Sequence, residues 1–126
     1  MLTQNIQPGF YETDALGHIN NTVVPRWFES ARLPIFKLFT PDLDPHKWQL
    51  IVVKIELEYL AQIAYQHCVE LQTQVTKVGN SSFQVSQAVL QGKCAAKGLT
   101  TMVQFNYQTQ QSIPISDDLR SALLAL

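Results

Sequence analysis

One short segment near the beginning of the chain gathers the side chains that can perform chemistry. Its members are an acid, a turn glycine, a histidine and two asparagines: Asp14, Gly17, His18, Asn20 and Asn21. A carboxylate can attack an activated carbonyl group or deprotonate the water that attacks it. A helix that starts directly after the segment has free backbone N–H groups, which can stabilise the oxyanion of the transition state. The segment therefore predicts a one-carboxylate site for attack on a carbonyl group.

Each of these residues also has a purely structural interpretation. Asp14 can act only as a turn or cap residue, and Gly17 lets the backbone bend sharply between the acid and the helix. His18 lies four residues after Asp14, so its ring can orient the carboxylate or hydrogen-bond to the backbone of the turn. Asn20 and Asn21 can cap the helix with their side chains, or can supply only backbone N–H groups. The residue types alone leave both interpretations open.

The element after this segment is predicted to be an amphipathic helix over about residues 22–38. Its apolar side chains recur at spacings of three and four, the period of one helical face: Val24, Trp27, Phe28, Ala31, Ile35 and Leu38. The charged side chains are predicted to lie elsewhere on the helix: Arg26, Glu29, Arg32 and Lys37. Glu29 is a second candidate acid, although its position beside Arg32 favours an ion pair or a solvated face. Pro34 removes one backbone hydrogen bond and should kink the helix or end it early.

The rest of the chain is predicted to be β-structure. Strands are predicted over residues 50–60, 69–78, 83–90 and 95–108, after a short bent edge strand over residues 5–13. In the first long strand, one half-buried face is predicted to carry Val53, Ile55, Leu57 and Tyr59. Ser116 is predicted to cap a short final helix over residues 117–124. Because the strands follow one another through tight turns, we predict an antiparallel sheet wrapped around the long helix, in the α+β class.

Two runs of residues resemble a known signature. The first contains Tyr11, Thr13-Asp14-Ala15 and Gly17-His18-Ile19-Asn20-Asn21, and the second contains Arg26-Trp27-Phe28-Glu29 and Ala31-Arg32. They resemble the hotdog-fold acyl-CoA thioesterases of the 4-hydroxybenzoyl-CoA thioesterase superfamily. Residues 55–60 and 113–115 resemble further parts of that family, so the resemblance covers essentially the whole chain. It implies a single hotdog thioesterase domain over residues 1–126.

The resemblance also implies a mechanism and an assembly. It implies thioester hydrolysis without a metal or an organic cofactor, in homodimers whose two sheets run together or in homotetramers. Asp14 is the implied nucleophile or general base, and the backbone N–H of Asn21 is implied to polarise the thioester carbonyl. By family analogy, residues that can hold the phosphates of coenzyme A are Ser81, Ser82 and Lys54. The chain departs from one subgroup of the family, since Asn21 replaces a histidine and Phe10 replaces a tyrosine.

The bulk composition excludes several other classes of protein. The formal net charge is −1, with nine basic and ten acidic residues, so there is no electrostatic footprint for nucleic acid or for a membrane surface. No apolar run approaches the length of a membrane span, and no signal peptide is visible, so we expect a cytoplasmic protein. Cys68 and Cys94 form no metal-binding motif and are expected to be reduced. There is no Gly-x-Ser-x-Gly elbow of a serine hydrolase.

Three functions are compatible with these observations. The first is an acyl-CoA thioesterase with Asp14 as the catalytic carboxylate. The second is an acyl-carrier-protein thioesterase, for which Arg26, Arg32 and Lys37 are the only candidates for a basic docking patch. The third is a non-catalytic hotdog protein that binds acyl thioesters, which the replaced histidine and tyrosine favour. Acyl chain length and the number of subunits are not encoded in any motif of the chain.

Overall fold

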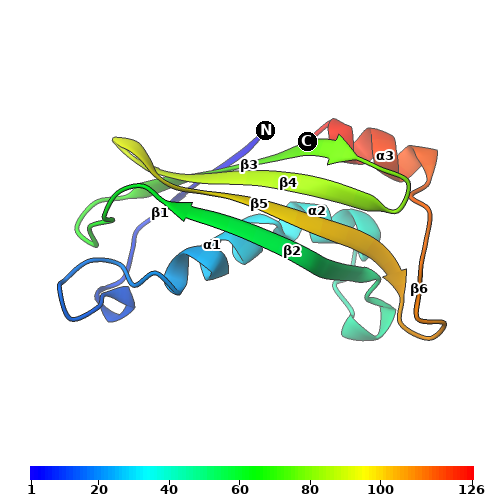
Figure 1. Ribbon diagram of the computed structural model, residues 1–126, viewed down its shortest axis with the longest axis horizontal. Helices are drawn as coiled ribbons and strands as arrows, with labels where there is room; N and C mark the ends of the chain where they lie inside the picture. The colour runs from blue at the N-terminus through cyan, green and yellow to red at the C-terminus, as the bar shows by residue number, and fades with distance from the viewer.

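All 126 residues are described by a computed structural model. Its sheet is antiparallel, with the strand order β1-β3-β4-β5-β2, and a short strand, β6, pairs with the end of β5 (Figure 1). The strands are β1 (Leu2–Ile6), β2 (Leu50–Tyr59), β3 (Val69–Val78), β4 (Ser82–Gln91), β5 (Lys93–Asn106) and β6 (Gln111–Ser112). The four long strands agree with the predicted ranges to within two residues at each end.

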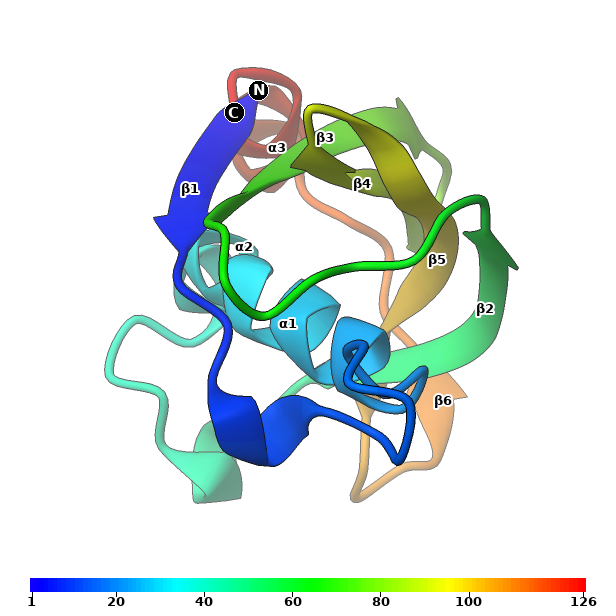
Figure 2. The ribbon, with the colours of Figure 1, turned by 90° about the vertical axis from the view of Figure 1, so that its left-hand side faces the viewer.

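The sheet curves around two consecutive helices, α1 (Val23–Ala31) and α2 (Leu33–Phe39) (Figure 2). A third helix, α3 (Asp117–Leu124), packs against β3 and α2 and lies close to both chain ends. Ser116 caps α3 as predicted, because its hydroxyl accepts a hydrogen bond from the N–H of Leu119 at 3.2 Å. The predicted α+β arrangement, a sheet wrapped around a central helix, is confirmed. None of the helices is long and apolar enough to cross a membrane.

The central helix is interrupted at Arg32, as Pro34 predicts. Pro34 has no N–H to continue the hydrogen-bond ladder, and the chain passes from α1 to α2 through Arg32 with φ −83° and ψ −1°. The predicted apolar face is buried at Val24, Trp27, Phe28, Ala31 and Ile35, while Leu38 is half-buried. The interruption therefore redirects the helix without exposing its apolar face.

The prediction that Arg32 lies away from the buried face of the helix is wrong. Its side chain is only 4 % exposed and donates from Nη1 to Gln87 Oε1 at 3.0 Å and to Thr100 Oγ1 at 3.4 Å. Arg32 follows Phe28 by four residues, one helical turn, so it lies on the same side as the buried residues. Gln87 continues the buried network by donating to the Phe28 carbonyl at 2.8 Å and to Thr73 Oγ1 at 3.1 Å. Polar side chains from β3, β4 and β5 thus form a buried hydrogen-bond network around Arg32, which takes the place of the hydration shell of an exposed arginine.

The first predicted strand is also corrected. Residues 5–13 were predicted to be one bent strand, but β1 ends at Ile6 and residues Phe10–Glu12 form a 3-10 turn. The turn is held by Glu12, whose carboxylate accepts from the N–H of Gly9 at 2.8 Å and from Trp27 Nε1 at 3.1 Å. These contacts with one side chain fasten the segment before Asp14 to helix α1.

The apolar face predicted for residues 50–60 is not buried in the single chain. Val53 is 56 % exposed, Ile55 is 50 % exposed and Tyr59 is 49 % exposed. The pairing of β2 with β5 shifts between Val52 and Lys54, so the alternation of the two faces is interrupted there. In addition, β2 is the last strand of the sheet and pairs only with β5, which leaves its other edge open. An alternating pattern indicates an apolar face, but it does not show what covers that face.

Candidate active site

Asp14 lies in a tight turn that fixes its carboxylate. Oδ1 accepts from the N–H of Leu16 at 2.9 Å and from the N–H of His18 at 3.3 Å. The backbone closes the turn twice, from the N–H of Gly17 to the Asp14 carbonyl at 3.1 Å and from the N–H of Asp14 to the His18 carbonyl at 2.8 Å. Gly17 has φ +81°, a backbone conformation that residues with a Cβ rarely adopt. Asp14 is therefore a turn residue, yet Oδ2 makes no hydrogen bond within the chain.

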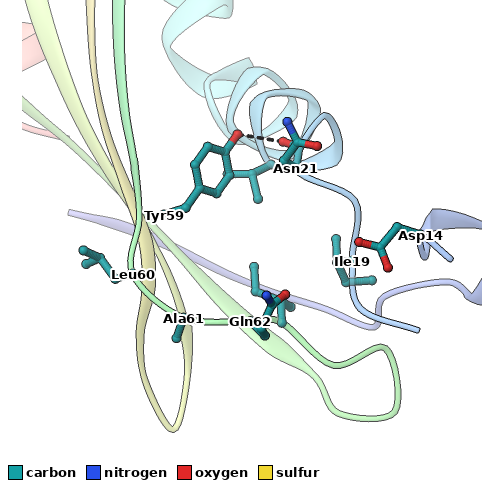
Figure 3. A pocket seen from close by; sticks show the side chains of 9 residues that line it. Asp14, Ile19, Asn21, Tyr59, Leu60, Ala61 and Gln62 are labelled. Atoms are coloured by element: carbon teal, nitrogen blue, oxygen red, sulfur yellow. Dashed lines mark hydrogen bonds between the residues drawn. The ribbon is translucent and has the colours of Figure 1, made fainter. Parts of the chain in front are cut away.

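A cleft of about 510 Å³ opens beside this carboxylate. One wall comes from the segment that contains Asp14 and from the start of α1, and the other from the chain at and beyond the end of β2 (Figure 3). The lining residues that matter for a reaction are Asp14, Asn21 and Tyr59, and the apolar wall includes Ile19, Val24 and Leu60. The cleft therefore offers a substrate an apolar surface, with the carboxylate of Asp14 at one side of the cleft.

The start of helix α1 leaves a hydrogen-bond donor without a partner at a residue that lines the same cleft. Asn20 holds the turn, since its Oδ1 accepts from the Thr22 N–H at 2.9 Å and from the Thr22 hydroxyl at 2.8 Å. The N–H of Val23 donates to the carbonyl of Asn20 at 3.0 Å. In contrast, the N–H of Asn21 has no acceptor in the chain, and Asn21 lines the cleft with Asp14. A free N–H at this position can bind an oxyanion.

His18 contributes through its backbone rather than through its ring. Its N–H holds Asp14 Oδ1, and the residue forms an isolated antiparallel bridge with Ala64. The ring nitrogen Nδ1 is buried and has no hydrogen-bond partner. The ring makes no hydrogen bond to the carboxylate of Asp14 or to the backbone of the turn, so neither of the two predicted contacts of this ring is present.

Tyr59 is a residue of the cleft that the sequence prediction treated only as an apolar strand position. Its hydroxyl donates to the backbone carbonyl of Asn21 at 2.7 Å, across the cleft from Asp14 (Figure 3). Partial burial raises the pKa of the Tyr59 hydroxyl above its usual value, so the hydroxyl remains a donor at neutral pH. The sequence does contain a signal for this contact: Tyr59 lies at the end of a predicted strand, where its hydroxyl can reach a neighbouring loop.

We predict that Tyr59→Phe lowers kcat for the thioester hydrolysis that the sequence resemblance implies by about two- to tenfold, the range expected for the loss of one neutral hydrogen bond. The reason is that the carbonyl of Asn21 loses the donor that holds the start of α1 in place. Steady-state assays on purified protein measure this change. Tyr65→Phe is the control, because Tyr65 packs edge-on against Phe10 through its ring, which phenylalanine retains. Equal kcat values for Tyr59→Phe and wild type would contradict the prediction.

The residues predicted to hold coenzyme A lie away from Asp14 in the single chain. Ser81 lies in the turn between β3 and β4 and Ser82 is the first residue of β4, at the end of the sheet opposite the cleft (Figure 1). Lys54 lies in the middle of β2, where its Nζ is 2.8 Å from Glu56 Oε1. The fold therefore does not bring these three residues together with Asp14 within one chain, and their role stays a prediction.

The second candidate acid, Glu29, lies outside this cleft. It is exposed on α1 and forms no ion pair with Arg32 or with any other cation. Of the two predicted alternatives for Glu29, an ion pair with Arg32 or a solvated face, the structure shows the solvated face. No group of three or more His, Cys, Asp or Glu side chains is arranged to hold a metal ion.

The chain matches a known protein family. Residues 8–123 match the family described as the thioesterase-like superfamily. The chain belongs to the thioesterase-like superfamily. This confirms the resemblance to hotdog thioesterases, while the roles that the resemblance implied for Asp14 and Asn21 stay predictions.

Solved structures and a curated relative agree with this placement. A predicted thioesterase from Bacillus stearothermophilus is 43 % identical, with a TM-score of 0.92, over 96 % of this chain and 92 % of its own. A thioesterase from Thermus thermophilus in complex with coenzyme A and Zn is 28 % identical, with a TM-score of 0.85, over 98 % of this chain and 91 % of its own. The uncharacterized protein YsmA from Bacillus subtilis (strain 168) is 26 % identical, over 91 % of this chain and 80 % of its own.

Proposed function

We propose that the protein is an acyl-CoA thioesterase, which hydrolyses the thioester to a free acid and coenzyme A. The observation that carries the proposal is that two residues line the same cleft: Asp14, whose carboxylate has a free oxygen, and Asn21, whose backbone N–H has no acceptor in the chain. The complex of a superfamily relative with coenzyme A supports the choice of substrate class.

The proposed reaction uses Asp14 on one side of the carbonyl carbon and the helix start on the other. The carboxylate of Asp14 either attacks the thioester carbon itself or removes a proton from the attacking water. The carbonyl oxygen gains negative charge, which the N–H of Asn21 stabilises, and the C–S bond then breaks to release the thiol. A donor of this kind contributes about 2.7–4 kcal/mol to the transition state where it has been measured in a hydrolase. On the first route the thiolate leaves an acyl–Asp14 anhydride, which water then hydrolyses to the free acid and the Asp14 carboxylate. On the second route the attacking water itself becomes part of the acid, and the proton that Asp14 removes passes to the thiolate. Both routes consume one water per thioester.

The buried position of Arg32 favours coenzyme A over an acyl-carrier protein. Of the three cations available for a basic docking patch, only Arg26 and Lys37 are exposed. Two separated cations offer little attraction for an acidic carrier protein, because exposed charges are screened by salt.

The test is thiol release from a panel of aliphatic and aromatic acyl-CoAs and from the matching acyl-carrier proteins. Tight binding of every acyl-CoA without any thiol release would favour the non-catalytic alternative.

We further propose that the active form is a homodimer joined through the open edge of β2. This edge has unpaired backbone groups and exposed apolar side chains at Val53 and Ile55. An exposed apolar edge of this kind is a template for pairing with another strand. Antiparallel pairing of two copies of β2 would bring the Leu50 end of one strand to the Tyr59 end of the other. The second copy would therefore close the open side of the cleft beside Tyr59.

Ile55→Lys is expected to convert the dimer into a monomer and to lower the hydrolysis rate at least tenfold. The lysine would place two like charges opposite each other across the two-fold interface, and its desolvation is unfavourable. Analytical ultracentrifugation measures the mass, and the thiol-release assay measures the activity. Ser121→Lys adds the same charge on the exposed side of α3 and should leave both unchanged. A dimeric Ile55→Lys protein with full activity would exclude β2 as the interface.

A further inference from the structure

Gln62 is a polar residue of the Asp14 cleft that the reaction proposed above does not use. It lies on the wall formed by the chain beyond β2, which faces the wall that carries Asp14 (Figure 3). Gln62 is exposed, and its amide makes no hydrogen bond within the chain. The other polar side chain of this wall, Tyr59, is already occupied, because its hydroxyl donates to the carbonyl of Asn21. Gln62 therefore offers a free donor and a free acceptor to the cleft.

Hydrogen bonds hold the backbone on both sides of Gln62, although the residue lies in no strand. On one side, the N–H of Ala61 donates to the carbonyl of Ala95 at 3.1 Å. On the other side, the Gln91 side chain binds both backbone groups of Ala64, accepting from its N–H at 2.9 Å and donating to its carbonyl at 2.8 Å. A side chain on a backbone fixed in this way keeps its place in the cleft.

The same part of the chain is bonded directly to the turn that carries Asp14. The N–H of Ile19 donates at 2.8 Å to the carbonyl of Ile63, the residue after Gln62. The N–H of His18, the residue before Ile19, donates to Asp14 Oδ1 at 3.3 Å. The two walls of the cleft are thus joined within one chain, and a second subunit is not needed to bring the amide and the carboxylate to the same cleft.

An acyl thioester in the cleft would displace bulk water from Gln62. The neighbours of Gln62 on this wall are apolar, at Leu60, Ala61 and Ile63, so their side chains cannot replace that water. A polar group that loses its hydrogen bonds in an apolar environment is unfavourable, so the amide favours keeping one water beside it. On the facing wall, Oδ2 of Asp14 also has no partner in the chain. One water between the two walls satisfies both oxygens.

We propose that Gln62 is a further catalytic residue, which holds the attacking water between its own Oε1 and Oδ2 of Asp14. The water donates one O–H group to each oxygen, so a lone pair of the water remains for the thioester carbon. As the new C–O bond forms, Asp14 takes one proton, and this proton passes to the thiolate when the C–S bond breaks. The proposal rests on the proposed thioesterase function and selects the route in which Asp14 is the general base.

Two substitutions of Gln62 separate an acceptor for water from other roles. Gln62→Met keeps the length of the side chain and removes the amide, so it is expected to lower kcat for acyl-CoA hydrolysis about ten- to hundredfold. KM should stay within about twofold, because the amide does not bind the substrate. Gln62→Glu retains an acceptor oxygen and should lose no more than about threefold in kcat at about pH 8, where carboxyl groups are ionised. Gln66→Met is the control, since Gln66 is exposed in the same loop and does not line the cleft.

The urea midpoints of all three variants should match that of the wild type, because both glutamines are exposed. An unchanged kcat for Gln62→Met in a protein whose wild type hydrolyses acyl-CoA would overturn this proposal alone. A higher KM with unchanged kcat would also overturn it, because the amide would then bind the coenzyme A arm. Equal losses in Gln62→Met and Gln62→Glu would overturn it as well, because the amide would then act as a donor. A wild type that releases no thiol from any acyl-CoA would overturn the proposed function, and this proposal with it.

Discussion

Asp14→Asn is expected to lower kcat for acyl-CoA hydrolysis by about 10²–10⁴-fold, the usual contribution of a positioned acid–base group. Asparagine is nearly the same size as aspartate, and its amide oxygen can still accept hydrogen bonds from the N–H groups of Leu16 and His18. The turn should therefore persist while the charge is lost. A neutral amide can neither attack the thioester carbon nor remove a proton from water. Thiol release under saturating substrate measures the change.

A matched control separates chemistry from folding. Asp42 also accepts a backbone hydrogen bond in a turn, from the N–H of Asp44 at 3.1 Å, but it lies in the loop between α2 and β2. Asp42→Asn should hydrolyse acyl-CoA at the wild-type rate. The urea midpoint of Asp14→Asn should lie near that of the wild type, because the turn is retained. If Asp14→Asn turns over at the wild-type rate, Asp14 is only a turn residue and the proposed mechanism is wrong.

Phe83→Ala is expected to lower the free energy of unfolding by about 3–5 kcal/mol, the range for removing a buried aromatic side chain. Phe83 is 1 % exposed on β4 and stacks against Phe39 of α2, with ring centroids 5.6 Å apart and an angle of 9° between the rings. Its removal leaves a cavity between the sheet and the helix that packed side chains cannot fill. Urea unfolding followed by circular dichroism measures the change.

The comparison variant for Phe83→Ala is Phe10→Ala. Phe10 is 72 % exposed and packs only edge-on against Tyr65, so its removal should cost less than about 1 kcal/mol. Since a small domain has a total stability of about 5–15 kcal/mol, Phe83→Ala should unfold within a visibly lower urea range. A loss for Phe83→Ala as small as that for Phe10→Ala would show that α2 and the sheet do not pack as described.

Local patterns in the sequence predicted most of the elements correctly. The period of two residues along β3 and the turn residues between β3 and β4 depend on neighbours in the chain, so they can be identified without the fold. The same holds for the interruption of the helix by Pro34 and for the cap of α3 by Ser116. The turn at Asp14 could be predicted for the same reason, because it is closed by residues no more than four positions away.

Errors arose where a side chain depends on residues far away in the sequence. Arg32 was predicted to lie away from the buried face of the helix, but it is buried and its acceptors are Gln87 and Thr100, 55 and 68 positions away. The role of Tyr59 depends on the carbonyl of Asn21, 38 positions away. No local pattern contains such contacts, because only the curvature of the sheet around α1 brings these segments together.

The sequence by itself predicted the order of the elements, which is encoded by residue types at short spacings, and its resemblance to known thioesterases indicated the superfamily and the candidate acid. Only the tertiary structure decided that the N–H of Asn21 is free, that Tyr59 holds the start of α1 and that β2 has an open edge. It also decided that Arg32 is a buried cation. The physical reason is that periodicity shows which face of an element is apolar, whereas packing between distant segments determines what covers that face and which donors remain free.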